Sequence, residues 1–95
     1  MGMKDAYENK LEAQLEEWKT EVNKLKAKAE KAHADAQLEY YKQIEELRAM
    51  QLAATEKLIE LKDASDDAWE DLKAGIENAW DSLENGIKSA ISRFK

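Results

Sequence analysis

The sequence predicts an all-α fold, in which a long helix is followed by a shorter C-terminal helix that folds back on it as an antiparallel coiled-coil hairpin. Ala, Glu, Lys, Leu and Arg make up 54 of the 95 residues, a share typical of long helices and coiled coils. Proline is absent and glycine occurs three times, so the chain lacks the turn residues that a β-sandwich or barrel requires. Apolar residues recur at every third or fourth position, which indicates helices with one apolar face.

An 11-residue repeat marks the C-terminal third of the chain. The sequence reads WEDLKAGIENA and then WDSLENGIKSA, and the two segments match in residue type. Eleven residues over three turns give ~3.67 residues per turn, close to the 3.6 of an α-helix. The repeated apolar residues therefore share one helix face; they are Trp69, Leu72, Ile76, Trp80, Leu83, Ile87, Ile91 and Phe94.

The first two thirds of the chain show the same period more loosely, in Tyr7, Trp18, Ala29 and Tyr40. Neither glycine nor proline interrupts this part, so the sequence predicts one helix over residues 4–62. A break at His33–Asp35 is the alternative, and it would give three helices of similar length. We favour the unbroken helix, because alanine is the best helix former and the apolar stripe continues without a phase jump.

The turn is predicted at residues 63–66, where short polar side chains cluster. Asp67 and Glu70 resemble a capping box, in which two side chains satisfy the free N–H groups at a helix start. The second helix is therefore predicted over residues 66–94, and residues 1–95 are expected to form a single helical domain.

The unequal lengths of the two predicted helices point to self-association. At 1.5 Å per residue they would be ~88 Å and ~43 Å long, so the second helix would cover only half of the first. Leu11, Trp18, Val22 and Leu25 would stay exposed, and a second antiparallel copy would cover them in a homodimeric helical bundle. The residues predicted to form the core and the self-association surface are Leu11, Trp18, Val22, Leu25, Ile44, Leu47, Leu58, Leu61, Trp69, Leu72, Ile76, Trp80, Leu83 and Ile87.

Charge and residue types argue against catalysis and against nucleic-acid binding. The formal net charge is −6, whereas duplex binding draws on a basic face. The chain has no cysteine and a single histidine, His33. Glu30 and His33 have the spacing of a di-iron ligand pair, but such a site needs two of these pairs and two further glutamates, so a packed histidine is the better interpretation. We expect no catalytic residue, no metal and no cofactor.

The sequence lacks an apolar run of 18 residues and the apolar core of a signal peptide, so we expect a cytoplasmic protein. Its expected role is structural or stress-protective, through self-association or through covering the surface of a client protein. The alternative role is binding to a lipid surface, because an 11-residue amphipathic repeat with tryptophans at residues 69–94 suits a helix lying among headgroups.

Three segments carry a resemblance to a known family: KLEAQLEEWKTEVNKLKAKAEKA, EYYKQIEELRA and AWEDLKAGIENAWDSL. They resemble a family of small bacterial coiled-coil proteins described as stress-response proteins, a name taken from a cyanobacterial member. The likeness extends from about Tyr7 to Phe94, and the positions of Trp18, Tyr40 and Trp69 are its more specific features. The resemblance implies a soluble, non-enzymatic helical protein linked to stress, with no catalytic residues.

Overall fold

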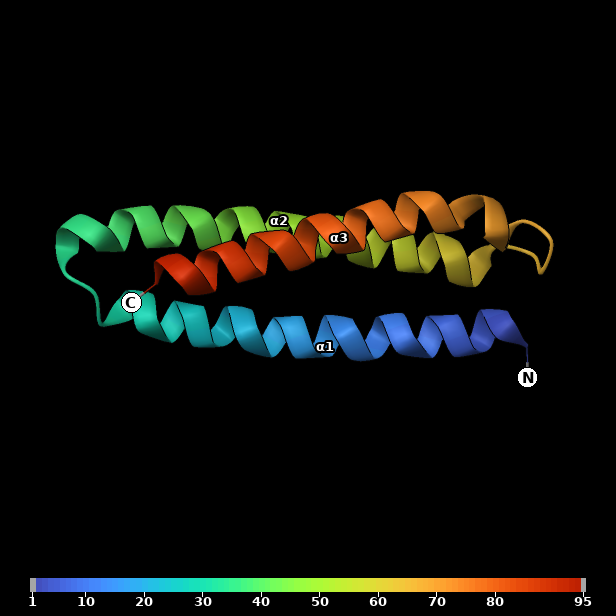
Figure 1. Cartoon of the computed structure of the whole chain (residues 1–95), viewed down its shortest axis with the longest axis horizontal. Coiled ribbons are helices and arrows are strands. Elements are labelled where there is room, and N and C mark those ends of the chain that lie inside the picture. Colours follow the sequence, from blue (N-terminus) through green and yellow to red (C-terminus); the bar gives the residue numbers. More distant parts are fainter. Residues whose placement is uncertain (1, 95) are drawn as a thin grey trace.

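The structure, a computed structural model, describes residues 2–94 and contains three helices (Figure 1). They are α1 (Met3–Glu30), α2 (Ala34–Asp63) and α3 (Trp69–Arg93), and the prediction of an all-α fold is confirmed. The helices lie side by side in a rod of 51 × 19 × 18 Å. Each helix runs opposite to the one before it, so α1 and α3 point in the same direction (Figure 1).

The prediction of one unbroken helix over residues 4–62 is wrong, because the chain turns at residues 31–33. His33 has φ −63° and ψ 152°, an extended conformation that any residue can adopt. No residue in the described part of the chain has a positive φ. The turn therefore needs no glycine, and this is why neither glycine nor proline marks it in the sequence.

Burial explains why the chain turns among good helix formers. Interrupting a helix at alanine and lysine gives up a few tenths of a kcal/mol per residue in intrinsic propensity. Burying one leucine or valine side chain stabilises the fold by ~1.5–3 kcal/mol. Leu11, Val22 and Leu25 of α1 are all buried in the folded chain. Folding back into three helices of similar length is thus favoured over one long, half-covered helix.

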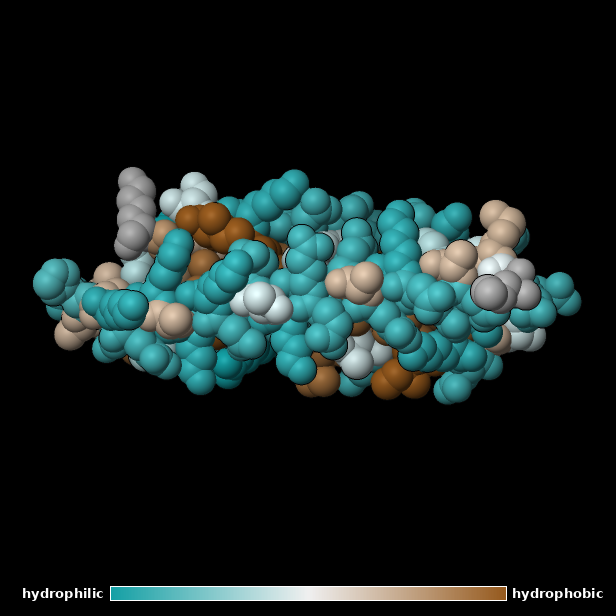
Figure 2. All heavy atoms as spheres, turned by 90° about the horizontal axis from the view of Figure 1, so that it is seen from below, coloured by the Kyte–Doolittle hydropathy of each residue, from teal (hydrophilic) through white to brown (hydrophobic). Residues whose placement is uncertain are grey.

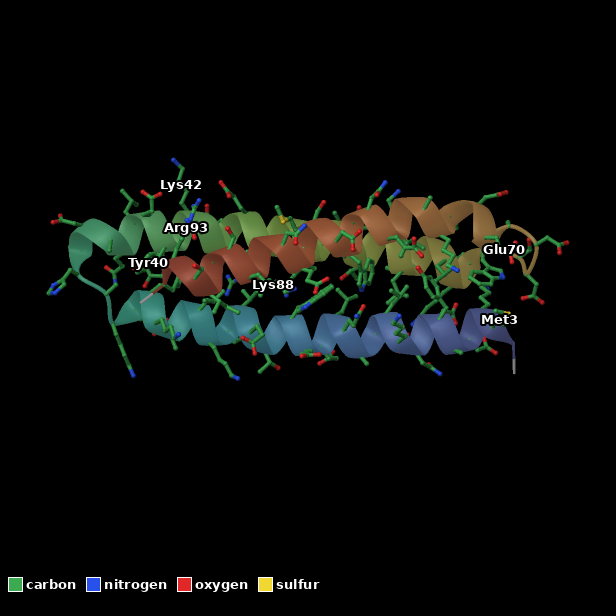
Figure 3. The ribbon with its side chains drawn as sticks, in the orientation of Figure 1. Met3, Tyr40, Lys42, Glu70, Lys88 and Arg93 are labelled. Carbon is green, nitrogen blue, oxygen red and sulfur yellow. The ribbon has the colours of Figure 1, made fainter. Side chains whose placement is uncertain are left out.

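Side chains from α2 bond to the C-terminal ends of both other helices. The Gln37 amide donates to the carbonyl oxygens of Ala29 and Glu30, at 3.2 Å and 3.3 Å. The Tyr40 hydroxyl donates to the Arg93 carbonyl oxygen at 3.3 Å, and both residues lie at the same end of the rod (Figure 3). The Ala29 carbonyl also accepts from the Ala32 N–H at 3.2 Å, and the side-chain bonds from α2 add to the partners of the carbonyls at the ends of α1 and α3.

Lys4 of α1 holds the C-terminal end of α2 in the same way. Its ammonium group donates to the carbonyl oxygens of Lys62 and Ala64, at 3.2 Å and 2.6 Å. A positive charge also interacts favourably with the negative end of a helix dipole. At the C-terminal end of each helix, backbone carbonyls therefore accept hydrogen bonds from a side chain of a neighbouring helix. These bonds form only when the helices are packed together.

The second connection runs from Ala64 to Ala68, so α3 begins three residues later than predicted. The expected capping box is not formed, since no side chain of α3 or its N-cap residue bonds to the helix start. Ser65 takes this role: its hydroxyl accepts a hydrogen bond from the Ala68 N–H at 3.2 Å, and its carbonyl accepts from the Trp69 N–H at 3.2 Å. The side chain that accepts a hydrogen bond at the start of α3 is thus that of Ser65, two residues before the expected Asp67.

One hydrophobic core fills the space between the three helices along the rod. None of its fully buried members is polar or charged among the described residues. These buried side chains are Leu11, Val22, Leu25, Ala29, Ile44, Leu47, Ala54, Leu58, Leu61, Trp69, Ile76, Trp80, Leu83, Ile87, Ala90 and Phe94.

Candidate functional site

The residues predicted for the core and for self-association come together inside a single chain. All of them are buried except Trp18 and Leu72, which are half-buried against the core. The expectation that Leu11, Val22 and Leu25 stay exposed is therefore wrong, as is the same expectation for half-buried Trp18, because α2 and α3 of the same chain cover this face of α1. A second copy is not needed to cover them, and any surface for a partner must lie elsewhere.

Two aromatic pairs join α1 to α3. The rings of Tyr7 and Trp69 have centroids 5.7 Å apart and are tilted by 42°. The rings of Trp18 and Trp80 are 6.3 Å apart and tilted by 51°. The two residues of each pair are separated by 62 positions, and the pairs are one 11-residue repeat apart. The repeat therefore sets the register in which the two parallel helices pack.

Lys73 places its ammonium group over the first of these pairs, 5.5 Å from the Tyr7 ring centroid and 5.8 Å from that of Trp69. This is within the range of a cation–π interaction. Burial, and then the negative charge of Glu77, raise the pKa of the Tyr7 phenol above its usual 10.0. Tyr7 is therefore neutral over the physiological range and acts here as a packing residue.

A small recess of about 160 Å³ lies beside the second pair, between α1 and α3. Its apolar wall is formed by Tyr7, Leu11, Trp18 and Trp80, and three carboxylates also line it; they are Glu77, Asp81 and Glu84. The Trp80 N–H is buried without a hydrogen-bond partner among the described residues. Its two indoles already pack against each other, so the recess offers little apolar surface to a ligand.

A longer groove of about 620 Å³ runs between α1 and α2. Its apolar surface comes from Leu15, Leu52 and Leu58. Its polar surface comes from both helices; the residues are Glu12, Glu16, Lys19, Arg48, Gln51, Thr55 and Lys62. Because three leucines share this open groove with seven polar or charged residues, it lacks the enclosed apolar lining of a small-molecule pocket.

An ion pair between Glu12 and Lys62 spans the two sides of this groove. The hydrogen bond from Lys62 to Glu12 is the main cause that raises the pKa of Lys62, and the charges of Glu12 and Glu8 act in the same direction. Both side chains are about half exposed, so the pair contributes little to the stability of the fold and mainly orients the two side chains across the groove.

Large apolar side chains on the outer face of α2 were not among the residues predicted for contact. Leu38, Leu52 and Ile59 are 77%, 63% and 54% exposed. They are 14 and 7 residues apart, so the heptad spacing was the signal that could have found them. The face seen in Figure 2, on the α1 side of the rod, is mostly hydrophilic and is broken by a few separate hydrophobic patches.

The turn that contains His33 leaves this residue exposed at one end of the rod rather than on an apolar stripe. Within residues 2–94 no three His, Asp or Glu side chains are close enough together to hold a metal ion. No helix in the same range is long and apolar enough to cross a membrane.

No protein-family model matches the chain, and comparisons with curated proteins and with solved structures find no match. The groove between α1 and α2 and the exposed face of α2 are therefore the features from which function can be argued.

Proposed function

We propose that the chain is a non-enzymatic, self-associating helical protein with a structural or stress-protective role in the cytoplasm, and that copies meet through α2. The observation that carries this proposal is the exposure of Leu38, Leu52 and Ile59 in heptad register on the outer face of α2. These three are more exposed than the other large apolar side chains on the surface of α2 and α3, which are Tyr41, Met50 and Ile91 at 36%, 37% and 43%.

The spacing of the three residues supports a helical partner. They span 21 positions, or ~32 Å of helix at 1.5 Å per residue. Coiled coils pack through apolar residues at two positions of each heptad; Leu38, Leu52 and Ile59 occupy one such position, and Glu45 occupies it in the heptad between Leu38 and Leu52. Covering an exposed leucine or isoleucine stabilises a complex by up to ~1.5–3 kcal/mol, before the entropic cost of association is subtracted. In a symmetric dimer both copies contribute these residues, which gives up to ~9–18 kcal/mol against a cost of association of ~4–15 kcal/mol; a micromolar complex needs a net ~8 kcal/mol.

Sedimentation equilibrium tests the proposal, with the native chain compared at several concentrations with a Leu52→Lys/Ile59→Lys variant. The native chain is expected to form a dimer or larger oligomer at micromolar concentration, and the variant is expected to be monomeric. Asn78→Lys/Ser82→Lys adds the same charge at exposed positions of α3 and is the matched control; it should associate as the native chain does. A native chain that stays monomeric at every concentration contradicts the proposal.

Lipid binding through α3 is a second candidate, because α3 separates its apolar and polar faces more sharply than α1 or α2 does. Its apolar face, including Trp69, Trp80 and Leu83, is buried in the closed bundle. Binding to lipid would thus require the bundle to open. Tryptophan emission measured with neutral and with anionic vesicles decides the point: an unchanged spectrum agrees with self-association, and a blue shift or a change in intensity favours the lipid surface.

A further inference from the structure

We propose that this chain exchanges α1 with a second copy. In the exchanged dimer residues 31–33 are helical and join α1 and α2 into one long helix, and α1 of each copy packs against α2 and α3 of the other. The surfaces that meet are those that already pack within the closed chain. The exchange therefore goes beyond the self-association proposed through the outer face of α2 and does not depend on it.

The buried faces of α1 and α2 are in phase along the sequence. An α-helix turns by ~100° per residue, so on one continuous helix the buried residues of both segments would lie within an arc of ~100°. Those residues are Leu11, Val22, Leu25, Ala29, Ile44, Leu47, Ala54, Leu58 and Leu61.

Only the exchanged dimer requires this agreement in phase. In the closed chain a turn separates α1 from α2, so each helix can orient its own apolar face toward the core. In the exchanged dimer the two long helices run antiparallel, and a two-fold axis perpendicular to them places both copies of α3 on one side of the pair. Each long helix then meets its partner and an α3 on the same face at both ends, and the two halves of that helix must share one apolar stripe.

The turn needs little change in its backbone to become helical. Lys31 already lies in the right-handed helical region, with φ −92° and ψ −6°. His33 has the φ of a helix, −63°, and departs from helical geometry only in its ψ of 152°. The surrounding residues 27–36 include five alanines and no glycine or proline. The sequence of the turn is therefore compatible with a continuous helix.

A continuous helix also supplies partners for backbone groups at the start of α2. This helix begins without a side-chain cap at His33. In an unbroken helix the N–H groups of residues 33–35 would donate to the carbonyls of residues 29–31. The two bonds from the Gln37 amide to the carbonyls of Ala29 and Glu30 would be given up in return. Exchange thus replaces side-chain bonds at the turn with regular backbone bonds.

The contacts of α1 with the other helices are the same in both forms, but in the exchanged dimer they join two chains. They include the pairing of Trp18 with Trp80 of α3 and the ion pair of Glu12 with Lys62 of α2. Exchange of an identical element is a low-cost route to a dimer. Because joining two chains costs entropy, the closed chain is favoured at low concentration and the exchanged dimer at high concentration.

The dimer has room for both copies of α3. The ring of Phe94, at the end of α3, stacks on Tyr40 with the centroids 4.1 Å apart. Tyr40 lies seven residues after His33, or ~10 Å along α2. The C-terminal end of α3 therefore stops short of the turn (Figure 1). Across the two-fold axis the ends of the two α3 helices would be ~20 Å apart, so they do not collide.

Substitutions at the turn test the exchange. All are made in the Leu52→Lys/Ile59→Lys background, which removes the contact proposed through the outer face of α2. Each variant is unfolded in urea and refolded at low and at high protein concentration, and monomer and dimer are separated by size-exclusion chromatography. Circular dichroism of each monomer fraction checks that the closed helices are intact. The parent background is expected to give a dimer fraction only after refolding at high concentration.

Two substitutions of His33 form a matched pair. His33 is exposed, and its N–H donates to no acceptor among the residues that the structure describes. His33→Pro keeps the φ of the closed turn but cannot lie inside a helix, so it should abolish the dimer. His33→Ala favours the helix and should preserve or raise the dimer fraction. Gln37→Ala removes bonds made only in the closed chain and should raise the ratio of dimer to monomer about tenfold.

Cross-linking shows which chain supplies α1. The chain has no cysteine, so Glu12→Cys/Lys62→Cys is introduced into the same background and treated with a short bis-maleimide. In the closed monomer this link lies within one chain, whereas in the exchanged dimer it joins two chains and gives a dimer on a denaturing gel. Ala13→Cys/Glu17→Cys, at exposed positions of α1, is the control and should link within one chain in both fractions.

The results separate the exchange from association through the outer face of α2. Covalent dimers confined to the dimer fraction, with loss of that fraction in His33→Pro and an increase in Gln37→Ala, support the exchange. A refolded chain that gives no dimer at high concentration, a dimer fraction that links only within chains, or a dimer that persists unchanged in His33→Pro overturns it. Each of these outcomes leaves the contact proposed through α2 standing, because that contact is absent from the background used.

Discussion

The indole rings of Trp18 in α1 and Trp80 in α3 pack at 6.3 Å with a tilt of 51°. The pair lies one repeat along the rod from Tyr7 and Trp69, which pack at 5.7 Å. An 11-residue spacing therefore occurs in both helices and brings aromatic residues into register on the parallel helices. The repeat therefore places the aromatic residues through which α1 packs against α3 within one chain.

Removing either indole should lower stability, and the losses should be coupled. Trp80 is buried, so Trp80→Ala should lower the free energy of unfolding by about 3–5 kcal/mol, and Trp18→Ala by less because Trp18 is half-buried. Urea denaturation of the single and double variants should give a coupling of about 0.5–1.5 kcal/mol. Trp18→Ala combined with Trp69→Ala is the control, because these residues lie one 11-residue repeat, or ~16 Å, apart along the rod, and here the losses should add. Additive losses for Trp18 and Trp80 would contradict the pairing.

The two glycines of α3 should respond in opposite ways to alanine. A Cβ at Gly75 would meet nothing within 4 Å, so Gly75→Ala should raise the free energy of unfolding by up to ~1 kcal/mol through helix propensity. A Cβ at Gly86 would lie 3.0 Å from Leu47 Cδ2 and 3.3 Å from Met50 Sδ. Leu47 is buried and has little room to move, so Gly86→Ala should give no gain or a loss of about 1 kcal/mol. Thermal unfolding of both variants checks this, and an equal gain for both would refute the close contact at Gly86.

The turn at residues 31–33 should depend on Gln37. Its amide donates to the carbonyls of Ala29 and Glu30, beside the backbone bond from Ala32 to Ala29, so Gln37→Ala should lower the free energy of unfolding by about 0.5–1.5 kcal/mol. Gln37→Glu places a carboxylate against the same oxygens and should cost more at neutral pH than at pH 3, where the group can donate. Gln43→Ala, also half-buried on α2 but without such a bond, is a suitable comparison. If the two alanine variants were equally stable, the capping role of Gln37 would be excluded.

The ion pair between α1 and α2 should be visible in the titration of Lys62. The hydrogen bond to Glu12 raises the pKa of Lys62 above its usual 10.5, so Glu12→Gln should lower it, as measured by NMR of the side-chain amine. A raised lysine pKa favours the folded state below pH 10.5, and this contribution is lost as the pH rises through the folded pKa. Lys62 therefore stays charged near pH 7, and its titration should not make the free energy of unfolding depend on pH in that range. A Lys62 pKa that is the same in the native chain and the variant would count against the pair in solution.

Composition and periodicity were sufficient to predict an all-α chain and most of its core. Leu25, Leu61 and Leu83 were identified by their spacing, and each is fully buried. The 11-residue repeat also identified Trp69 and Trp80 as members of one buried face. These predictions succeed because helical periodicity identifies the apolar face of a helix, and that face is buried whether the helix packs against its own chain or against a second copy.

Periodicity did not decide where the chain reverses: a break at His33–Asp35 was the alternative to one long helix, and the structure agrees with that alternative. The turn before α2 uses extended backbone at His33 and an amide from Gln37, and neither feature has a distinctive sequence signal. What decides the turn is burial of α1 by α2 and α3, a long-range effect that local propensity does not contain. The same limit applies to Lys4, whose two bonds to the end of α2 span about 60 positions of sequence.

The exposed apolar face of α2 was missed for a related reason. Leu52 and Ile59 belong to a second, weaker stripe on α2, and the stronger stripe through Leu47 and Leu58 dominates the pattern. Assigning one apolar face to each helix left the second stripe unexplained. Once three helices share one core, any apolar residue outside it becomes a candidate for contact with another molecule.

A distance measurement between residues 12 and 62 tests the central claim, that α1 and α2 cover each other within one chain. Cysteines at these two positions carry spin labels, since the native chain has no cysteine, and excess unlabelled protein removes distances between copies. The bundle places these side chains in contact across the groove, so a short distance is expected. One unbroken helix would separate them by ~75 Å, and a long distance, or loss of the short one on dilution with unlabelled protein, would contradict the three-helix chain.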